Sequence, residues 1–153
     1  MTEMRTKFLF RLALEVGAHH AVGPTPVGDR RVAPISGGAF DGPKLSGTVR
    51  PGGTDWITVD AGGTCLRIDV RVPLRTHDGA LLVMAYRGVR SGPPEVLERV
   101  ARGEAVDPAS YYYRVAGSFE TASPELAWLN TVVAVAVGSR SSTGPTYEVY
   151  ELL

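Results

Sequence analysis

The amino-acid sequence predicts an all-β protein, a single antiparallel β-barrel of about eight or nine strands with one short helix and a helical turn. Three observations favour this fold class. Apolar and polar residues alternate in several segments, which is the two-residue period of a strand. The 153 residues include 18 glycines and 11 prolines, enough to form many turns. Short turns between successive strands favour antiparallel pairing, and a barrel is favoured over a sandwich because closure removes exposed sheet edges.

The first half of the chain is predicted to consist of strands and turns. The clearest alternation places Leu66, Ile68 and Val70 on one face and Arg67 and Asp69 on the other. Proline and glycine inside the second predicted strand indicate an edge, a bulge or a bend. The predicted strands cover residues 8–16, 31–40, 45–49, 56–59 and 65–74, and residues 17–29 are expected to form a long loop.

The second half is predicted to contain both helical segments. Residues 80–88 are almost continuously apolar, which is typical of a buried strand. Pro93 begins the helix predicted over 93–102, and Gly103 follows as its C-cap. Ser123 is the expected N-cap of a helical turn that extends to Asn130. The remaining predicted strands cover residues 111–120, 132–137 and 147–152.

Length and charge limit the classes of protein. The length fits one domain, residues 1–153. Sixteen basic residues balance sixteen acidic ones, which argues against a nucleic-acid partner. No apolar run approaches the roughly 18 residues that span a bilayer, and the first ten residues carry no signal-peptide pattern. We therefore expect a cytoplasmic protein with no membrane partner. Cys65 is the single cysteine, so no disulfide forms within the chain.

Eight segments of the sequence resemble those of a known family. They are residues 34–43, 52–56, 74–80, 87–94, 107–108, 112–114, 119–121 and 128–130. Over nearly its whole length the chain resembles a bacterial and fungal family of small β-barrel proteins catalogued as a domain of unknown function (number three-two-three-seven). The resemblance implies a barrel related to allene oxide cyclase and calycin-like barrels. It supplies no settled reaction, because the likeness to a cyclase is one of fold and not of chemistry.

Five charged residues are candidates for catalysis. Asp55, Asp69 and Glu120 could move a proton, and Arg71 and Arg114 could stabilise developing negative charge. Asp69 and Arg71 lie two residues apart on one strand and therefore share a face. The alternative interpretation is that Asp55 caps a turn, that Asp69 and Arg71 form a weak surface pair, and that Glu120 is a surface residue.

A second set of residues is expected to bind the substrate. Its members are large aromatic or basic side chains in or beside the segments that carry the resemblance: Trp56, Tyr86, Arg87, Tyr112 and Trp128. Three of them, Trp56, Tyr86 and Tyr112, are expected to line one pocket at a barrel mouth together with Asp55, Asp69, Arg71 and Arg114. The alternative interpretation is that Trp56 is a core residue and that the tyrosines are present because aromatic residues favour strands.

No pattern in the sequence indicates a cofactor. His19 and His20 are adjacent on the expected loop, and His77 lies in a turn, which is unsuitable spacing for a metal site. No glycine-rich phosphate loop is present. The favoured hypothesis is a cofactor-independent enzyme that binds a small, mostly apolar oxygenated molecule and promotes cyclisation, isomerisation, or addition or elimination of water. The alternatives are a non-catalytic binding or carrier barrel and a structural protein. We also expect a homodimer, because the wholly apolar face of residues 66–74 would need a covering surface.

Overall fold

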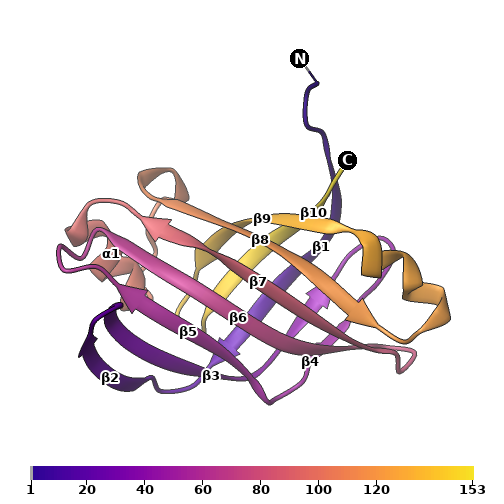
Figure 1. Ribbon diagram of the computed structural model, residues 1–153, viewed down its shortest axis with the longest axis horizontal. Helices are drawn as coiled ribbons and strands as arrows, with labels where there is room; N and C mark the ends of the chain where they lie inside the picture. Colours follow the sequence, from indigo (N-terminus) through magenta and orange to yellow (C-terminus); the bar gives the residue numbers. More distant parts are fainter. Residues whose placement is uncertain (1) are drawn as a thin grey trace.

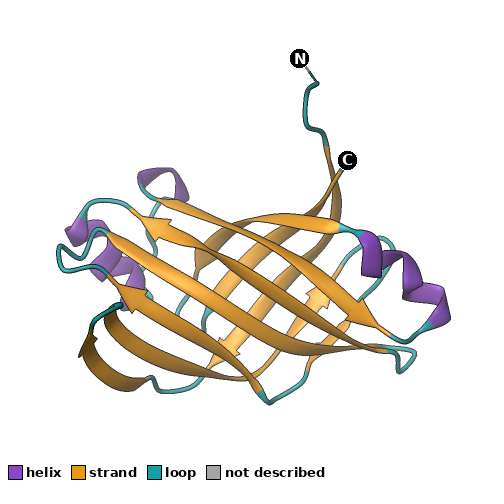
Figure 2. Ribbon diagram, in the orientation of Figure 1, coloured by secondary structure: helices purple, strands orange, loops and turns teal. Residues whose placement is uncertain are grey.

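The structure, a computed structural model, describes residues 2–153, and its strands close into an antiparallel β-barrel (Figure 1). The predicted fold class is therefore confirmed. Strands dominate the chain, and the helical segments lie at the two ends of the barrel (Figure 2). The elements in chain order are β1 (Thr6–Val16), β2 (His20–Thr25), β3 (Gly28–Asp41), β4 (Gly47–Val49), β5 (Gly53–Val59), β6 (Cys65–Thr76), β7 (Leu81–Ser91), α1 (Pro94–Ala101), η1 (Pro108–Ser110), β8 (Tyr112–Thr121), η2 (Pro124–Thr131), β9 (Val133–Arg140) and β10 (Pro145–Leu152).

Eight strand positions form the closed wall. β1 completes the ring because it pairs with β10 on one side and with β3 on the other. From β10 the wall continues through β9, β8 and β7 to β6, each antiparallel to the next. β5 and β4 share the position between β6 and β3, because each pairs with different parts of both neighbours. Closure pairs the edges that an open sheet of this size would expose.

Residues 17–29 contain strand β2, so the prediction of a long loop there was wrong. β2 forms a hairpin with β3, which begins at Gly28 rather than at residue 31. Most side chains of β2 are exposed. A strand without a buried face has no reason to alternate apolar and polar residues, and so it leaves no two-residue period in the sequence. The hairpin lies at the end of the barrel that also carries α1 (Figure 1).

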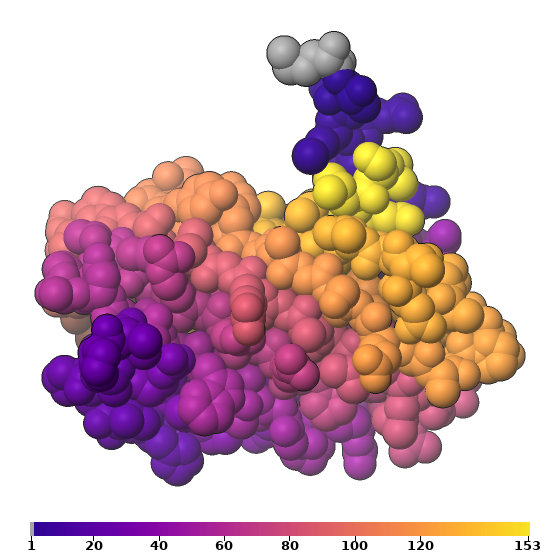
Figure 3. Space-filling view, viewed as in Figure 1, coloured from indigo at the N-terminus to yellow at the C-terminus, as the bar shows by residue number. Residues whose placement is uncertain are grey.

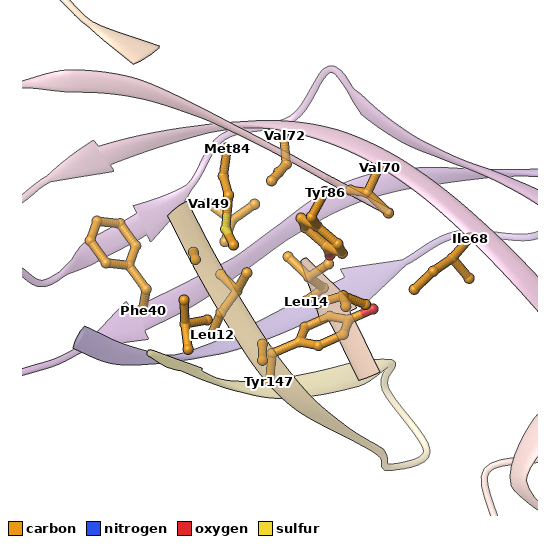
Figure 4. Close-up of a cluster of buried hydrophobic side chains, with 14 of the residues drawn as sticks. Leu12, Leu14, Phe40, Val49, Ile68, Val70, Val72, Met84, Tyr86 and Tyr147 are labelled. Atoms are coloured by element: carbon orange, nitrogen blue, oxygen red, sulfur yellow. The ribbon is translucent and has the colours of Figure 1, made fainter. Parts of the chain in front are cut away.

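The apolar face of β6 fills the barrel interior. Leu66, Ile68, Val70, Val72 and Leu74 are all buried. Figure 4 shows side chains of β6 directed into one cluster with residues of β1, β3, β4, β7 and β10. This face is therefore covered by the protein itself, and the reason for expecting a homodimer was wrong. The homodimer stays a prediction without that support.

The two ends of the barrel differ in character. At one end Phe10 contacts Phe40 and Phe119 edge to face, and η2 covers the opening with its buried Leu129. At the other end α1 packs Leu97 and Val100 inward, and the neighbouring strand ends carry polar and charged side chains. Among residues 2–153 no helix is long and apolar enough to cross a membrane. Both termini lie on the same side of the barrel, where the start of β1 and the end of β10 project together (Figure 3).

Candidate functional site

A small cavity lies inside the α1 end of the barrel. Its volume is about 40 Å³. Six of its lining side chains are polar or charged, and they come from the connection before β2 and from five strands. The lining residues are Val16, His19, Arg31, Ala33, Asp55, Ile57, Leu66, Ile68, Arg90, Ala101, Tyr113, Arg140 and Pro145. The strand ends thus direct polar groups into a space that the apolar core does not fill.

Asp55 lies on the inner face of β5 between Gly53 and Ile57, which are also buried. Only 9% of its surface is exposed. The pairing of β5 with β6 includes Asp55 and Thr58 but omits Trp56 and Ile57. Beside this gap the backbone N–H of Asp69 donates a hydrogen bond to Asp55 Oδ1 at 3.3 Å. Burial raises the pKa of the Asp55 carboxyl to about 7, against a smaller lowering by that hydrogen bond.

Three buried tyrosines contact one another, and one of them, Tyr113, lines the cavity. The hydroxyl oxygens of Tyr113 and Tyr147 are 2.7 Å apart, so one donates a hydrogen bond to the other. The rings of Tyr86 and Tyr147 meet edge to face at 5.1 Å (Figure 4). The Tyr86 hydroxyl is buried and has no hydrogen-bond partner of normal geometry. Burial raises the pKa of all three hydroxyls, so they remain protonated near neutral pH.

Gly138 leaves the space that the Tyr113 ring occupies. A Cβ atom at position 138 would lie 2.6 Å from two ring carbons of Tyr113. β8 and β9 are paired here, with Arg114 opposite Val137. A side chain at position 138 would therefore displace the ring whose hydroxyl reaches Tyr147.

Two arginines enter the cavity from β7 and β9. Arg90 is only 5% exposed, and its guanidinium lies over the Tyr113 ring at 5.5 Å. The Nε atoms of Arg90 and Arg140 are buried and have no hydrogen-bond partner. Across residues 2–153, no ion pair of 4.0 Å or less joins either guanidinium to Asp55. Burial, and then repulsion from Arg90, lowers the pKa of Arg140.

The rim of the cavity carries a third arginine and a histidine. Arg31 forms an ion pair with Asp29 at 3.0 Å, so its charge is balanced. Burial lowers the pKa of His19, and the positive charges of Arg140, Arg31 and Arg90 act in the same direction. His19 is therefore mostly neutral near pH 7. In the described part of the chain, no cluster of three His, Cys, Asp or Glu side chains is arranged to hold a metal ion.

A wider groove adjoins the cavity on the outside. Its volume is about 300 Å³, and it runs between α1 and the turn that joins β5 to β6. Arg31, Leu66, Arg90 and Ala101 line both spaces. The other residues of the groove are Val59, Ala61, Gly62, Gly63, Pro94, Leu97 and Glu98. The groove is thus the approach to the cavity from solvent.

Of the residues predicted from the sequence, Asp55 and Tyr86 point into the barrel interior. Both are buried, and Asp55 lines the cavity directly. The prediction that Trp56, Asp69, Arg71, Tyr112 and Arg114 would join Asp55 in one pocket was wrong, because alternation along the strands puts them on the outer face. Asp69 forms an ion pair with Arg87 there, at 2.9 Å. Arg71 and Glu120 are exposed.

The predicted aromatic walls also lie outside the cavity. Trp56 is 50% exposed and Tyr112 is 52% exposed. The guanidinium of Arg114 lies over the Tyr112 ring at 4.9 Å on this outer face. Trp128 lies in η2 at the opposite end of the barrel, where the Lys44 ammonium covers its ring at 4.8 Å. On the outer face, one groove of about 400 Å³ is lined by Trp56, Asp69 and Arg87, and another of about 750 Å³ by Arg87, Tyr112 and Arg114. These residues share locations with one another but not with Asp55, and their roles in binding stay a prediction.

The site predicted from the sequence does not include Arg90, Tyr113, Arg140 or Tyr147. For two of them a signal was available. Arg90 follows Leu82, Met84 and Tyr86 at even spacing along β7, and all three are buried. Tyr113 lies an even number of positions from Val115 and Phe119 in β8, so all three side chains point to the same buried face. A charged or polar residue that falls on the buried face of a strand indicates a functional site. Burying such a group costs free energy unless it is hydrogen-bonded or paired.

These features define a closed β-barrel with a packed interior and a small polar cavity at one end. The chain belongs to the family described as "Protein of unknown function (DUF3237)", which it matches over residues 4–152. It is 31% identical over 150 residues to a UPF0311 protein of Rhodopseudomonas palustris, covering 98% of this chain and 97% of that protein. The resemblance inferred from the sequence is thereby confirmed.

Solved structures share this fold. The crystal structure of the Rhodopseudomonas palustris protein RPA1785 has a TM-score of 0.91 at 30% identity, covering 100% of this chain and 99% of the other. A beta-barrel like protein from Acinetobacter baumannii has a TM-score of 0.86 at 36% identity, covering 100% and 98%. A protein from Penicillium herquei, described as an enzyme, has a TM-score of 0.75 at 25% identity, covering 100% and 97%.

Proposed function

We propose that this protein is a cofactor-independent enzyme that transfers a proton to or from a small, mostly apolar oxygenated substrate at the α1 end of the barrel. The reaction class is cyclisation, isomerisation, or addition or elimination of water. The observation that carries the proposal is the buried Asp55 carboxyl in the polar cavity. Its pKa of about 7 lets it act as an acid or as a base near neutral pH.

The surroundings of Asp55 supply the other requirement of such chemistry. Proton transfer creates charge on a substrate oxygen, and donors fixed in advance stabilise that charge. Tyr113, Arg90 and Arg140 line the same cavity and carry such donors. The hydrogen bond to Tyr147 fixes the Tyr113 hydroxyl, and the ring of Tyr113 packs against Gly138, which has no side chain to displace it. The donors therefore need little reorganisation during a reaction.

The packed interior favours an enzyme over a carrier. Carrier barrels enclose their ligand, and pockets for such molecules typically measure about 300–1,000 Å³. Here the cavity inside the barrel measures about 40 Å³, so only a small part of a ligand can enter it. That arrangement suits contact with one reacting group of a substrate. The description of the Penicillium herquei neighbour as an enzyme also supports the proposal.

The proposal is tested first on Asp55 itself. Carbon-13 NMR of the side-chain carboxyl in the full-length protein should give a pKa close to 7, and a value close to 4 would contradict the role in proton transfer. The second test uses a panel of hydroxy-enones and enolisable ketones in deuterated water, with mass spectrometry to detect ring closure, water loss or deuterium uptake. Asp55→Asn should lower the rate by about 10²–10⁴.

Asp41→Asn is the matched control for this substitution. Asp41 also lies in a barrel strand, β3, but its side chain is exposed. It pairs with Arg11 of β1, and neither residue lines the cavity. The control should keep the activity of the wild-type protein. Equal activity of Asp55→Asn and Asp41→Asn on the converted compound would contradict the proposal.

A further inference from the structure

Within the described residues, two guanidinium groups in the cavity have no hydrogen-bond or ion-pair partner. Arg90 is buried, and the buried Nε atoms of Arg90 and Arg140 donate no hydrogen bond. Within residues 2–153 neither arginine takes part in an ion pair. An arginine remains charged in proteins, and a buried charge is stable only when it is paired and hydrogen-bonded. An anion is the kind of partner that would satisfy both groups.

The charges around the cavity do not supply that anion. Arg31 is already neutralised by Asp29. Asp55 is the carboxyl among the described residues that line the cavity, and with a pKa of about 7 it is only about half ionised at neutral pH, so it balances at most one of the two guanidinium charges. His19 contributes no negative charge in either protonation state. The cavity consequently has an excess of positive charge.

The size of the cavity limits what the anion can be. About 40 Å³ holds roughly three water-sized groups, since one water needs about 10–15 Å³ of such space. A planar oxyanion head, such as a carboxylate or the oxygen of an enolate or phenolate with its carbon, fits that volume. Arginine suits such a head because its planar donors match two oxygen lone pairs.

The remainder of the ligand has a place in the adjoining groove. The groove is continuous with the cavity at Leu66, Arg90 and Ala101. Its walls include Val59, Pro94 and the buried Leu97. An apolar body of ring size fits its volume of about 300 Å³.

We infer that the site binds an amphiphilic small molecule whose oxyanion head lies between Arg90 and Arg140 and whose apolar body lies against α1. This inference deepens the proposed function, because it names the substrate class of the same site. Arg90 and Arg140 recognise the charge, and Ala101 sets the width of the passage from the groove to the cavity.

The test measures binding rather than turnover. Isothermal titration of the full-length protein at pH 7 uses benzoate and 4-nitrophenolate as anionic probes and benzamide as the uncharged analogue of benzoate. Chloride at equal ionic strength serves as the control for general charge screening. Benzoate or 4-nitrophenolate should bind, and benzamide should bind at least about tenfold more weakly. Tighter benzoate binding identifies a carboxylate head, and tighter 4-nitrophenolate binding identifies an enolate or phenolate head.

Arg90→Gln and Arg140→Gln should each weaken binding of the preferred probe by about tenfold to a hundredfold, as expected for a lost charged hydrogen bond. Arg11→Gln is the matched control, because Arg11 is exposed on β1. It should bind the probe as the wild-type protein does. Circular dichroism checks that the variants are folded, and replacing an unpaired buried charge should leave the melting temperature unchanged or raised.

Ala101→Phe tests the position of the apolar body. It should weaken binding of 2-naphthoate relative to acetate, because the larger side chain narrows the passage. Equal affinity for benzoate and benzamide, competition by chloride at the same concentration, or wild-type affinity in both Arg90→Gln and Arg140→Gln would overturn the inference.

Asp55→Asn separates this inference from the proposed function. It should retain anion binding while losing turnover. Anion binding with undiminished turnover in Asp55→Asn would overturn the proposed function alone. Loss of turnover in Asp55→Asn without selective anion binding would overturn this inference alone.

Discussion

The backbone N–H of Asp69 donates a hydrogen bond to Oδ1 of Asp55, while the Asp69 carboxylate lies on the opposite face of the barrel wall. Two carboxylates that are neighbours across β5 and β6 thus have different environments. One is buried in a cavity, and the other is paired with Arg87 in solvent. The difference follows from strand geometry, since successive side chains point to opposite faces.

We predict that Asp55 makes the stability of the protein depend on pH. Its folded pKa of about 7 is above the ordinary value of 3.8, so the folded state holds a proton that the unfolded state releases. Stability from this group is therefore fully present below about pH 4 and is lost as the pH rises towards 7. The difference in melting temperature between the wild-type protein and Asp55→Asn should shift in favour of the wild type as the pH falls from 8 to 5. Differential scanning calorimetry across this range measures it, and a constant difference would contradict the raised pKa.

His19 makes stability depend on pH in the opposite direction to Asp55, and the same comparison of wild type with Asp55→Asn removes its effect. Its pKa is lowered in the folded protein, so its contribution to stability is lost as the pH falls through that pKa. Both proteins in the comparison retain His19, and subtracting one curve from the other isolates Asp55.

The exposed Asp69–Arg87 pair should contribute little to stability. The Asp69 side chain is 40% exposed and the Arg87 side chain is 78% exposed, so water and salt screen the attraction between their charges. We expect Asp69→Asn to change the free energy of unfolding by less than about 1 kcal/mol. Urea unfolding at low and at high salt measures this change. A loss of several kcal/mol would mean that the Asp69 side chain has a structural role that its outer position does not suggest.

The Tyr113–Tyr147 hydrogen bond should show coupling in a double-mutant cycle. Tyr113→Phe or Tyr147→Phe leaves the other buried hydroxyl without this partner, which costs about 1–3 kcal/mol. The double Phe variant removes both hydroxyls and should be less destabilised than the sum of the single variants. Urea denaturation of the four proteins gives the coupling energy. Additive effects would show that the hydroxyls do not depend on one another.

Gly138→Ala should damage the site through Tyr113. The new Cβ atom would meet the Tyr113 ring at 2.6 Å. The ring is buried and cannot move away freely, so overpacking should cost about 1–3 kcal/mol. Thermal unfolding measures the loss, with Gly62→Ala as the control, because a Cβ atom there has no neighbour closer than 3.8 Å. An unchanged melting temperature for Gly138→Ala would contradict the close approach.

The sequence was sufficient to predict the strands that have one buried face. In β6 every second side chain is buried, and in β8 Tyr113, Val115 and Phe119 are buried in the same alternation, so the hydrophobic effect imposes that period directly on the sequence. The β2 hairpin buries no face and was missed for that reason. The helix over 93–102 was predicted because Pro93 and Gly103 mark its ends, and α1 indeed lies at Pro94–Ala101.

The location of the site was decided by the tertiary structure. Alternation assigns Asp69 and Arg71 to a common face, but it does not say whether that face is inside or outside the barrel. Closure of the wall turned the apolar face of β6 inward, and this placed Asp69, Arg71 and Arg87 in solvent. The same closure brought together Asp55 from β5, Arg90 from β7, Tyr113 from β8 and Arg140 from β9, which are up to 85 positions apart in the chain. Periodicity within one strand carries no information about which strands meet across a lumen, because that depends on the pairing order and register of the whole sheet.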